Sequence, residues 1–481
     1  MGVSDTSFIK SIFKFSISSW VNFFISILSV IITTRIFSPE MYGSINMYNS
    51  ASSLFMGIIC LGLDSGFLRF YNEPPKGYDE KQLMAKCMSL PVLFLLGIIV
   101  FVVPFFYKDI SVLLFGKVSL LAVILLCINT MSLAILNFFS IAYRISNDAR
   151  RYTIQSILVQ FFTKIFVITA ALFNPKLETV IIFNTIGVFV LSIIYFKIQK
   201  KSVLPSKINW SMQGFSEVFK YAIFSWPTVI LIYLNSFFPQ MIIKNNLGDY
   251  ELGIYSSTAF FVGALGVVLN GFKTYWASFM YANYKTERSK IIKIHDYVVL
   301  LVVFILSFFI VFQNLLYGLI GIKFHQSRYF FTLVLVYPLF NLISETTSYG
   351  ISIAKKSQTT LGIFLLSTAV NLVFGCIFVN CFGTVGVAIA SMLSAFVQLV
   401  ISTIIGQKYY RTIKDPRRTF ISILLILVLA CSNYFFAEEY IFELFAVFIL
   451  NAIIIIGYRQ ELSDIISLST AFINKYKRPK V

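Results

Sequence analysis

Long apolar stretches alternate with short polar connections along the whole chain. Many of the stretches run for about 20 residues, which is the length that an α-helix needs to cross a hydrocarbon core of roughly 30 Å. The connections are too short to fold as separate soluble domains. The pattern predicts an all-α integral membrane protein. Its fourteen predicted spans cover residues 11–33, 42–64, 87–107, 117–138, 152–173, 177–196, 219–241, 252–272, 296–320, 329–352, 358–380, 383–406, 418–437 and 440–458.

Positive charge is shared unevenly between alternate connections. Lys and Arg gather after the even-numbered spans, where Arg69, Lys86 and Lys273 lie, and they are sparse after the odd-numbered spans. Connections rich in Lys and Arg stay in the cytoplasm. Both termini are then expected to be cytoplasmic, which requires an even number of spans and fits fourteen.

The composition supports a bilayer as the solvent of this chain. Hydrophobic residues make up 58% of the 481 positions and charged residues only 12%, with a mean hydropathy of +0.83. Soluble domains carry roughly 25% charged residues. The net charge of +18 is spread over short clusters between the spans, so nucleic acid is not an expected partner. His295 and His325 lie far apart, and no metal site or cofactor is expected.

An internal repeat links the two halves of the chain. Residues 13–20 (FKFSISSW) and 219–226 (FKYAIFSW) share five identical positions and open the first and seventh spans. Residues 35–43 and 245–253 also correspond, and both segments end in glycine. Because six spans separate the copies, they share one orientation and form a parallel repeat, as transporters often do. We expect two six-helix lobes around a central cavity, residues 1–210 and 211–410, followed by two further helices and a tail in 411–481.

Polar residues recur at helical spacing inside several spans. The first carries Lys14, Asn22 and Ser26, the fifth Gln160 and Lys164, among others. The tenth span carries Asn341 and Glu345 at the same spacing. Steps of three and four residues place such side chains on one helical face. One interpretation is a hydrated central cavity, and the other is helix packing through small and polar residues.

Two charged residues deep in spans are the leading candidates for function. Lys164, near the middle of the fifth span, suits the binding of pyrophosphate or an acidic sugar. Glu345 can carry a proton or bind sodium. A structural ion pair, such as one between these two residues, is the alternative. Lys14 can extend to the interface, and Asp64 either serves ion coupling or forms a local ion pair with Arg69.

Several of these motifs resemble the polysaccharide flippases of the MOP (multidrug/oligosaccharidyl-lipid/polysaccharide) superfamily. The segment 34–43, with Arg35 and Gly43, is similar to their signature after the first helix, and 62–71, which ends near Arg69, to the one after the second. The start of the eighth helix, 247–256, and the segment 371–391 also resemble them. Together the motifs extend over the first twelve spans.

The resemblance implies a flippase with two six-helix lobes, alternating access and fourteen spans. Its substrate would be an undecaprenyl-pyrophosphate-linked oligosaccharide, as in O-antigen (Wzx-type) flippases of the bacterial inner membrane. A cationic lumen would include Lys164 and Lys14, with proton or sodium coupling and with a glycan polymerase and chain-length proteins as partners. Many relatives have an Asp-Arg pair late in the seventh helix, where this chain has Pro239 and Gln240. A role for that pair cannot be carried over.

Three other functions remain open at this point. A drug exporter of the MATE branch and a lipid II flippase share the expected fold. A membrane glycosyltransferase or O-antigen polymerase would need catalytic acids or arginines outside the membrane. The predicted external connections are short, and the first holds only Glu40 as an acid. A transporter is therefore the expected class, and an enzyme is not expected.

Overall fold

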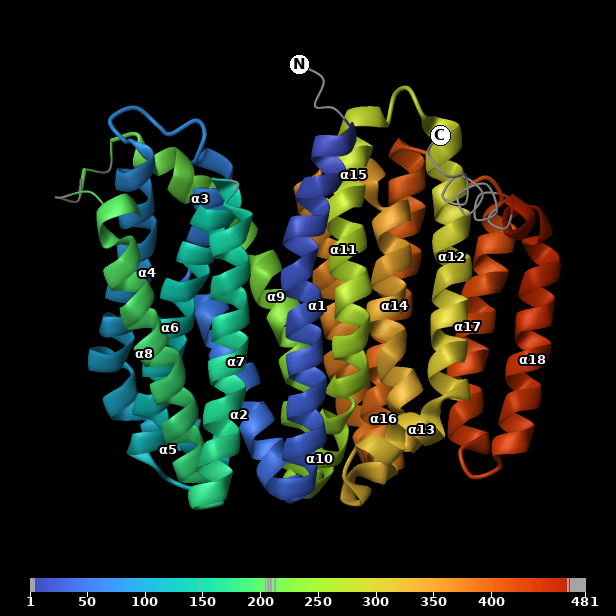
Figure 1. The fold of residues 1–481 in the computed structure, drawn as a ribbon, viewed down its shortest axis with the longest axis horizontal. Helices are drawn as coiled ribbons and strands as arrows, with labels where there is room; N and C mark the ends of the chain where they lie inside the picture. Colours follow the sequence, from blue (N-terminus) through green and yellow to red (C-terminus); the bar gives the residue numbers. More distant parts are fainter. Residues whose placement is uncertain are drawn as a thin grey trace, which may run out of the picture. The chain divides into compact units, whose positions relative to one another are not determined.

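The computed structural model describes residues 5–146, 148–203, 205, 210, 211, 213–464 and 467. Side chains at 5–19, 201–203, 357 and several positions between 264 and 282 are not described. The described chain is helical (Figure 1), and no β-strand occurs in it. The helices are α1 (Asp5–Ile36), α2 (Pro39–Ile59), α3 (Leu63–Phe70), α4 (Glu80–Phe101), α5 (Val103–Phe115), α6 (Leu120–Ile145), α7 (Ala149–Phe173), α8 (Leu177–Val203), α9 (Phe215–Leu247), α10 (Asp249–Ser257), α11 (Ala259–Asn283), α12 (Arg288–Val311), α13 (Gln313–Leu319), η1 (Ile322–Tyr329, a 3₁₀ helix), α14 (Phe331–Thr347), α15 (Tyr349–Ile353), α16 (Ser357–Tyr409), α17 (Pro416–Phe436) and α18 (Tyr440–Gly457).

The predicted all-α membrane fold is confirmed. Within the described residues, nine helices are long and apolar enough to cross a membrane, or up to eleven if each of two bent helix pairs is one span. Each of the fourteen predicted spans overlaps at least one helix of the structure, and 11–33 and 252–272 lie on α1, α10 and α11, which are not among these nine. Large apolar side chains such as Phe101, Phe105 and Phe173 are more than 70% exposed, as lipid-facing residues of a membrane protein are.

The long helix α16 contains two of the predicted spans and reverses at their predicted connection. Gly383 has φ 57° and ψ −137°, a conformation that side chains disfavour. A Cβ added at Gly386 would lie 2.2 Å from the Phe378 carbonyl oxygen, so the two arms meet closely there. Ser367 and Ser394 hydrogen-bond across the arms at 2.9 Å. The glycines thus fold α16 into a helical hairpin with two arms.

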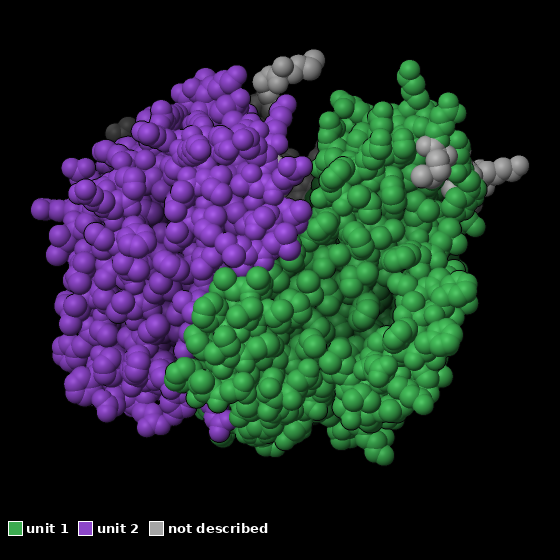
Figure 2. Space-filling view, turned by 180° about the vertical axis from the view of Figure 1, so that it is seen from behind, with its two compact units in different colours: residues 1–267, 320–325, 368–387 green, residues 268–319, 326–367, 388–481 purple. Residues whose placement is uncertain are grey.

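The chain divides into two compact units, which Figure 2 shows in green and purple. Unit 1 comprises residues 1–267, 320–325 and 368–387, and unit 2 comprises 268–319, 326–367 and 388–481. The lobes expected at residues 1–210 and 211–410 stay a prediction. The core of unit 1 includes Phe67, Phe138 and Phe215, and that of unit 2 includes Trp276 and Ile291.

The internal repeat brings its two equivalent glycines into contact within unit 1. A Cβ on Gly43 would lie 2.6 Å from the backbone nitrogen of Gly253, and a Cβ on Gly253 only 1.9 Å from the carbonyl oxygen of Pro39. Corresponding positions of a repeat meet each other where the copies are related by a two-fold axis. The contact between α2 and α10 therefore requires glycine on both helices, which explains the glycine at the end of each repeat segment.

A sharp bend separates α2 from α3. Leu61 (φ 51°) and Gly62 (φ 70°) are left-handed, and the two helices meet at 59°. The bend releases backbone carbonyl groups that the helix would otherwise bond. The indole nitrogen of Trp226 on α9 donates to the carbonyl oxygens of Gly57 at 3.0 Å and Ile58 at 3.1 Å. Trp226 thereby satisfies polar backbone groups that lipid could not.

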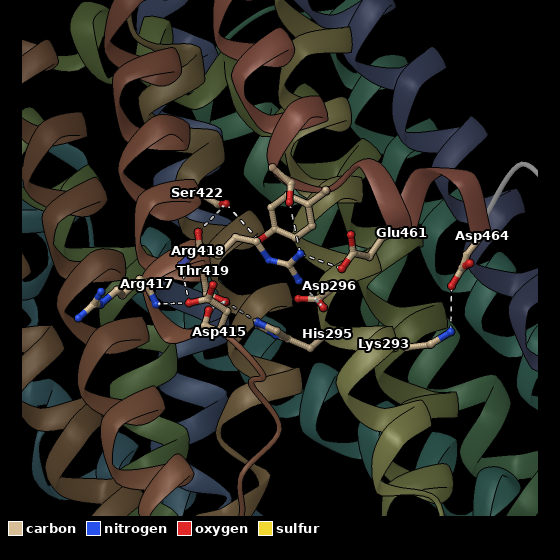
Figure 3. Close-up of polar contacts among 12 residues, drawn as sticks. Lys293, His295, Asp296, Asp415, Arg417, Arg418, Thr419, Ser422, Glu461 and Asp464 are labelled. Carbon is tan, nitrogen blue, oxygen red and sulfur yellow. Dashed lines mark hydrogen bonds and ion pairs between the residues drawn. The ribbon is translucent and has the colours of Figure 1, made fainter.

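Arg418 fastens α17 to its neighbours in unit 2 (Figure 3). Its guanidinium pairs with Asp296 of α12 at 2.6 Å and with Glu461 after α18 at 2.8 Å. It also lies 4.2 Å from the ring centroid of Tyr458. The side chain of Asp296 is only 5% exposed, so its charge depends on the arginine. The fully buried His295 adds contacts to hydroxyl groups on α14 and α17.

We expect Arg418→Met to lower the free energy of unfolding by about 2 kcal/mol, because it leaves the buried Asp296 without its cation. Thermal unfolding of the purified protein in detergent measures the change. Arg417→Met is the matched control, since Arg417 is the exposed neighbour on the same helix. Equal unfolding temperatures for the two variants would mean that the ion pairs of Arg418 contribute nothing.

Candidate functional site

The polar stripe predicted on the first and fifth spans lies at the contact between α1 and α7 in unit 1. Asn22 Nδ2 donates to Ser156 Oγ at 2.7 Å, and Gln160 Nε2 donates to Ser26 Oγ at 2.8 Å. Both pairs are separated by 134 residues, so the helices run in the same direction in a fixed register. Four residues further along both helices, the same register places Lys164 of α7 beside Val30 of α1.

Lys164 is half-buried on this face of α7. Among the residues whose side chains the structure describes, no carboxylate forms an ion pair with it and no group hydrogen-bonds to it. A lysine amine in such a place is costly unless it meets water or an anion. Lys14, the second predicted cation, lies outside the residues whose side chains are described. Asn22, Gln160 and Lys164 stay predicted substrate contacts.

A polar cavity of about 260 Å³ lies in unit 2 and contains the predicted residues Asn341 and Glu345. Glu345 Oε1 is 3.0 Å from Lys273 Nζ. Gln398 of α16 donates its Nε2 to Asn341 Oδ1 at 2.9 Å. The hydroxyl groups of Ser344 and Ser402 are 3.0 Å apart across the same two helices. Four helices, α11, α14, α15 and α16, thus contribute polar groups to one cavity.

The lysine that pairs with Glu345 is Lys273, which the sequence analysis placed in a cytoplasmic connection. The predicted connection is wrong, because Lys273 lies within a helix, whereas its cytoplasmic side stays a prediction. α11 continues to Asn283, ten residues beyond Lys273, or about 15 Å along the axis at the usual rise. Buried Trp276, Phe279 and Met280 extend the helix past the lysine. Their spacing of three and four residues was the signal that could have lengthened the predicted span.

Lys86 is a second lysine that was predicted to lie in a connection but lies in a helix. It lies in α4 and is 1% exposed. Its Nζ donates to Tyr78 Oη at 2.8 Å and to the carbonyl oxygen of Ser211, and it lies 4.5 Å from the ring centroid of Phe215. The amine therefore ties the segment before α9 to α4. With its hydrogen-bonding capacity used in this way, Lys86 is a structural residue rather than a ligand for substrate.

The expected ion pair between Asp64 and Arg69 does not form. Arg69 Nη1 pairs with Glu73, one helical turn further along the chain, at 3.5 Å. Asp64 lies in the first turn of α3, and its buried Oδ1 has no hydrogen-bond partner within the described part of the chain. This alternative was wrong because Asp64 and Arg69 lie five residues apart in α3, about 140° around the helix axis from each other.

Two buried carboxylates, Asp296 and Glu443, were missed by the sequence analysis. Glu443 in the first turn of α18 is fully buried, and one of its oxygens accepts a hydrogen bond from Gln313 Nε2 of α13. Arg328 Nε donates to the amide oxygen of the same glutamine at 3.2 Å. Glu443 lies inside the last predicted span, 440–458. The remaining motif residue, Arg35, is exposed near the end of α1.

Comparison with known families gives one match. A family profile described as "Polysaccharide biosynthesis protein" matches residues 8–277, which is more than half of the chain. No curated protein sequence matches the chain.

Solved structures show the same fold at low sequence identity. "Lipid II flippase MurJ, inward closed conformation" is 16% identical, with a TM-score of 0.66 over 93% of this chain and 99% of that one. An inward-facing MATE family transporter of the MOP superfamily is 14% identical, with a TM-score of 0.58 over 80% and 93%. A MOP superfamily transporter from Pyrococcus furiosus is 16% identical, with a TM-score of 0.58 over 83% and 95%. The chain therefore has the fold of MOP superfamily transporters.

Proposed function

Since the chain belongs to the polysaccharide biosynthesis protein family, we propose that it is a flippase for an undecaprenyl-pyrophosphate-linked oligosaccharide. It would carry the repeat unit of an O-antigen or another surface polysaccharide across the bacterial inner membrane by alternating access. A glycan polymerase and chain-length proteins would act on the product. The similarity in fold to a lipid II flippase supports the choice of a lipid-linked glycan as the class of substrate.

The observation that carries the proposal is Lys164, a half-buried amine on α7 for which the described side chains offer no counterion. The pyrophosphate of the lipid carrier is the anionic part of such a substrate and would supply the missing charge. A lysine amine binds phosphate as a compact point charge with three donors. Asn22 and Gln160, on the same seam, would add amide donors. Lys14 would lie on the same helix as Asn22.

Energy for the transport cycle would come from a proton or sodium gradient. Two carboxylates are proposed for this coupling. Glu345 faces a polar cavity that water and a proton can reach, and Asp64 has a buried oxygen without a partner among the described residues. Both could change charge state during a cycle.

Deletion of the gene in the cell that makes this chain tests the proposal. We expect the lipid-linked oligosaccharide to accumulate and the surface polysaccharide to be lost, with both effects reversed by the wild-type gene. Susceptibility to cationic drugs should not change. A deletion strain with normal surface polysaccharide and raised drug susceptibility would instead identify a MATE-type drug exporter, and an unglycosylated lipid intermediate would point to an enzyme.

A further inference from the structure

The cavity of unit 2 differs chemically from the seam that holds Lys164. Its charged lining residues are Lys273 and Glu345, which form an ion pair and leave the cavity with no net charge. An anion placed beside Lys273 would also face the carboxylate of Glu345, and a cation beside Glu345 would face the amine. The cavity therefore does not favour an ion of either sign. It favours a neutral ligand that can both donate and accept hydrogen bonds.

The rest of the lining offers such hydrogen bonds in quantity. Gln398 Nε2 donates to Asn341 Oδ1, and Gln398 Oε1 accepts from Ser367 Oγ at 3.2 Å. Each amide nitrogen carries two hydrogens, so each group keeps an N–H donor for a ligand. Serine and threonine hydroxyl groups from α14 and α16 surround them. A chain of hydroxyl and amide groups that can each donate and accept matches the hydroxyl groups of a sugar, which have the same property.

Two tyrosines complete the cavity on one side. The rings of Tyr281 and Tyr349 pack edge to face, with centroids 5.7 Å apart, and both line the cavity. An aromatic ring gives an apolar surface with a polar tip. The C–H face of a sugar ring can lie against such a surface while its hydroxyl groups reach the amides.

The size of the cavity limits the ligand further. Its volume of about 260 Å³ is slightly below the roughly 300–1,000 Å³ of pockets that hold drug-sized molecules. One sugar ring fits this space better than an oligosaccharide does. We propose that the unit 2 cavity is a carbohydrate subsite that binds one neutral sugar of the transported glycan. This inference rests on the proposed function.

Within this subsite, Lys273 and Glu345 act together. The ammonium donates to sugar hydroxyl groups and the carboxylate accepts from them, and each keeps the other neutralised. Removal of either one leaves an unpaired charge, which a neutral sugar cannot compensate. The amide pair is therefore the better target for variants, since Asn341→Ala and Gln398→Ala remove hydrogen bonds without creating charge.

Transport of two matched lipids in vesicles tests the subsite. The probes are a short-chain polyprenyl pyrophosphate with one N-acetylhexosamine and the same lipid without sugar, each with a fluorophore on the prenyl end. The Asn341→Ala/Gln398→Ala variant should move the sugar-bearing lipid about tenfold more slowly, because it loses two neutral hydrogen-bonding groups, and should move the sugar-free lipid at the wild-type rate. The proposal would be overturned if the double variant slowed both lipids to the same extent, or if it slowed neither lipid. Asn380→Ala, which removes an exposed amide of α16, is the matched control.

A binding measurement separates this proposal from the proposed function. Trp276 reports on the cavity, because its indole nitrogen donates to the carbonyl oxygen of Glu345 at 2.8 Å. Titration of the purified protein with methyl glycosides of N-acetylglucosamine, glucose, galactose and rhamnose should give a saturable fluorescence change for at least one sugar. The double variant should lose it, and Asn380→Ala should keep it. If wild type moves neither lipid but binds a sugar in this way, the flippase proposal fails and the subsite stands. The absence of a saturable signal in correctly folded wild type would overturn the subsite.

Discussion

Lys164→Met is expected to weaken the binding of an undecaprenyl pyrophosphate lipid by about 10- to 100-fold. A charge-assisted hydrogen bond to an ionised group contributes roughly 1.5–3 kcal/mol, and each 1.4 kcal/mol is a factor of ten in affinity. Methionine keeps the length and apolar stem of lysine, so that packing against α1 changes little. Lys164→Arg keeps the positive charge and should retain most of the affinity.

Binding of a fluorescent polyprenyl pyrophosphate to the purified protein at several salt concentrations measures this effect. Wild-type affinity should fall as salt screens the charge, and the Met variant should respond less to salt. The matched control is Lys117→Met, which removes an exposed lysine of unit 1 that pairs with Glu178 at 2.7 Å. If Lys164→Met bound the lipid with wild-type affinity, the amine would serve only packing. If Lys164→Arg lost as much affinity as Lys164→Met, the positive charge would not explain the binding.

Gly253→Ala is expected to destabilise the protein by about 3 kcal/mol, at the upper end of the cost of overpacking. The new methyl group would lie 1.9 Å from the carbonyl oxygen of Pro39, and backbone atoms cannot move aside as a flexible side chain can. α2 and α10 would have to separate along their contact. Thermal unfolding in detergent measures the loss.

Gly263→Ala is the control, because no atom lies within 4 Å of the position that a Cβ would take there. This variant should be at least as stable as wild type, since alanine favours a helix over glycine by about 1 kcal/mol. The Gly43→Ala/Gly253→Ala variant should lose less stability than the sum of the two single variants, because one separation of the helices relieves both contacts. Wild-type stability in Gly253→Ala would contradict the close contact between the repeat copies.

The fold was predictable from the sequence because a bilayer permits few alternatives. Lipid cannot hydrogen-bond to the backbone, so an apolar stretch of sufficient length becomes a helix. The connection between the predicted spans 358–380 and 383–406 was placed next to the observed turn, where Gly383 has φ 57°. The repeat also indicated which positions would correspond, and Gly43 and Gly253 do meet.

The candidate site was predictable only in part. Periodicity placed Asn22 and Ser26 on one face of the first span, and Gln160 and Lys164 on one face of the fifth. The hydrogen bonds between α1 and α7 join these two faces. Periodicity does not show where a helix ends, however. Lys273 was therefore assigned to a connection, although it lies ten residues before the end of α11. The partner of Glu345 could not be identified, since residues 273 and 345 are brought together by packing that no local pattern encodes.

The central claim is that this chain moves a pyrophosphate-linked glycolipid and that Lys164 holds the pyrophosphate. Leaflet exchange of a fluorescent undecaprenyl-pyrophosphate oligosaccharide in liposomes that contain the purified protein tests it most directly. We predict protein-dependent exchange by wild type and Lys164→Arg under an imposed proton or sodium gradient, and at least about a tenfold slower exchange by Lys164→Met. The absence of exchange by folded wild-type protein under both gradients, or equal exchange by wild type and Lys164→Met, would contradict the account.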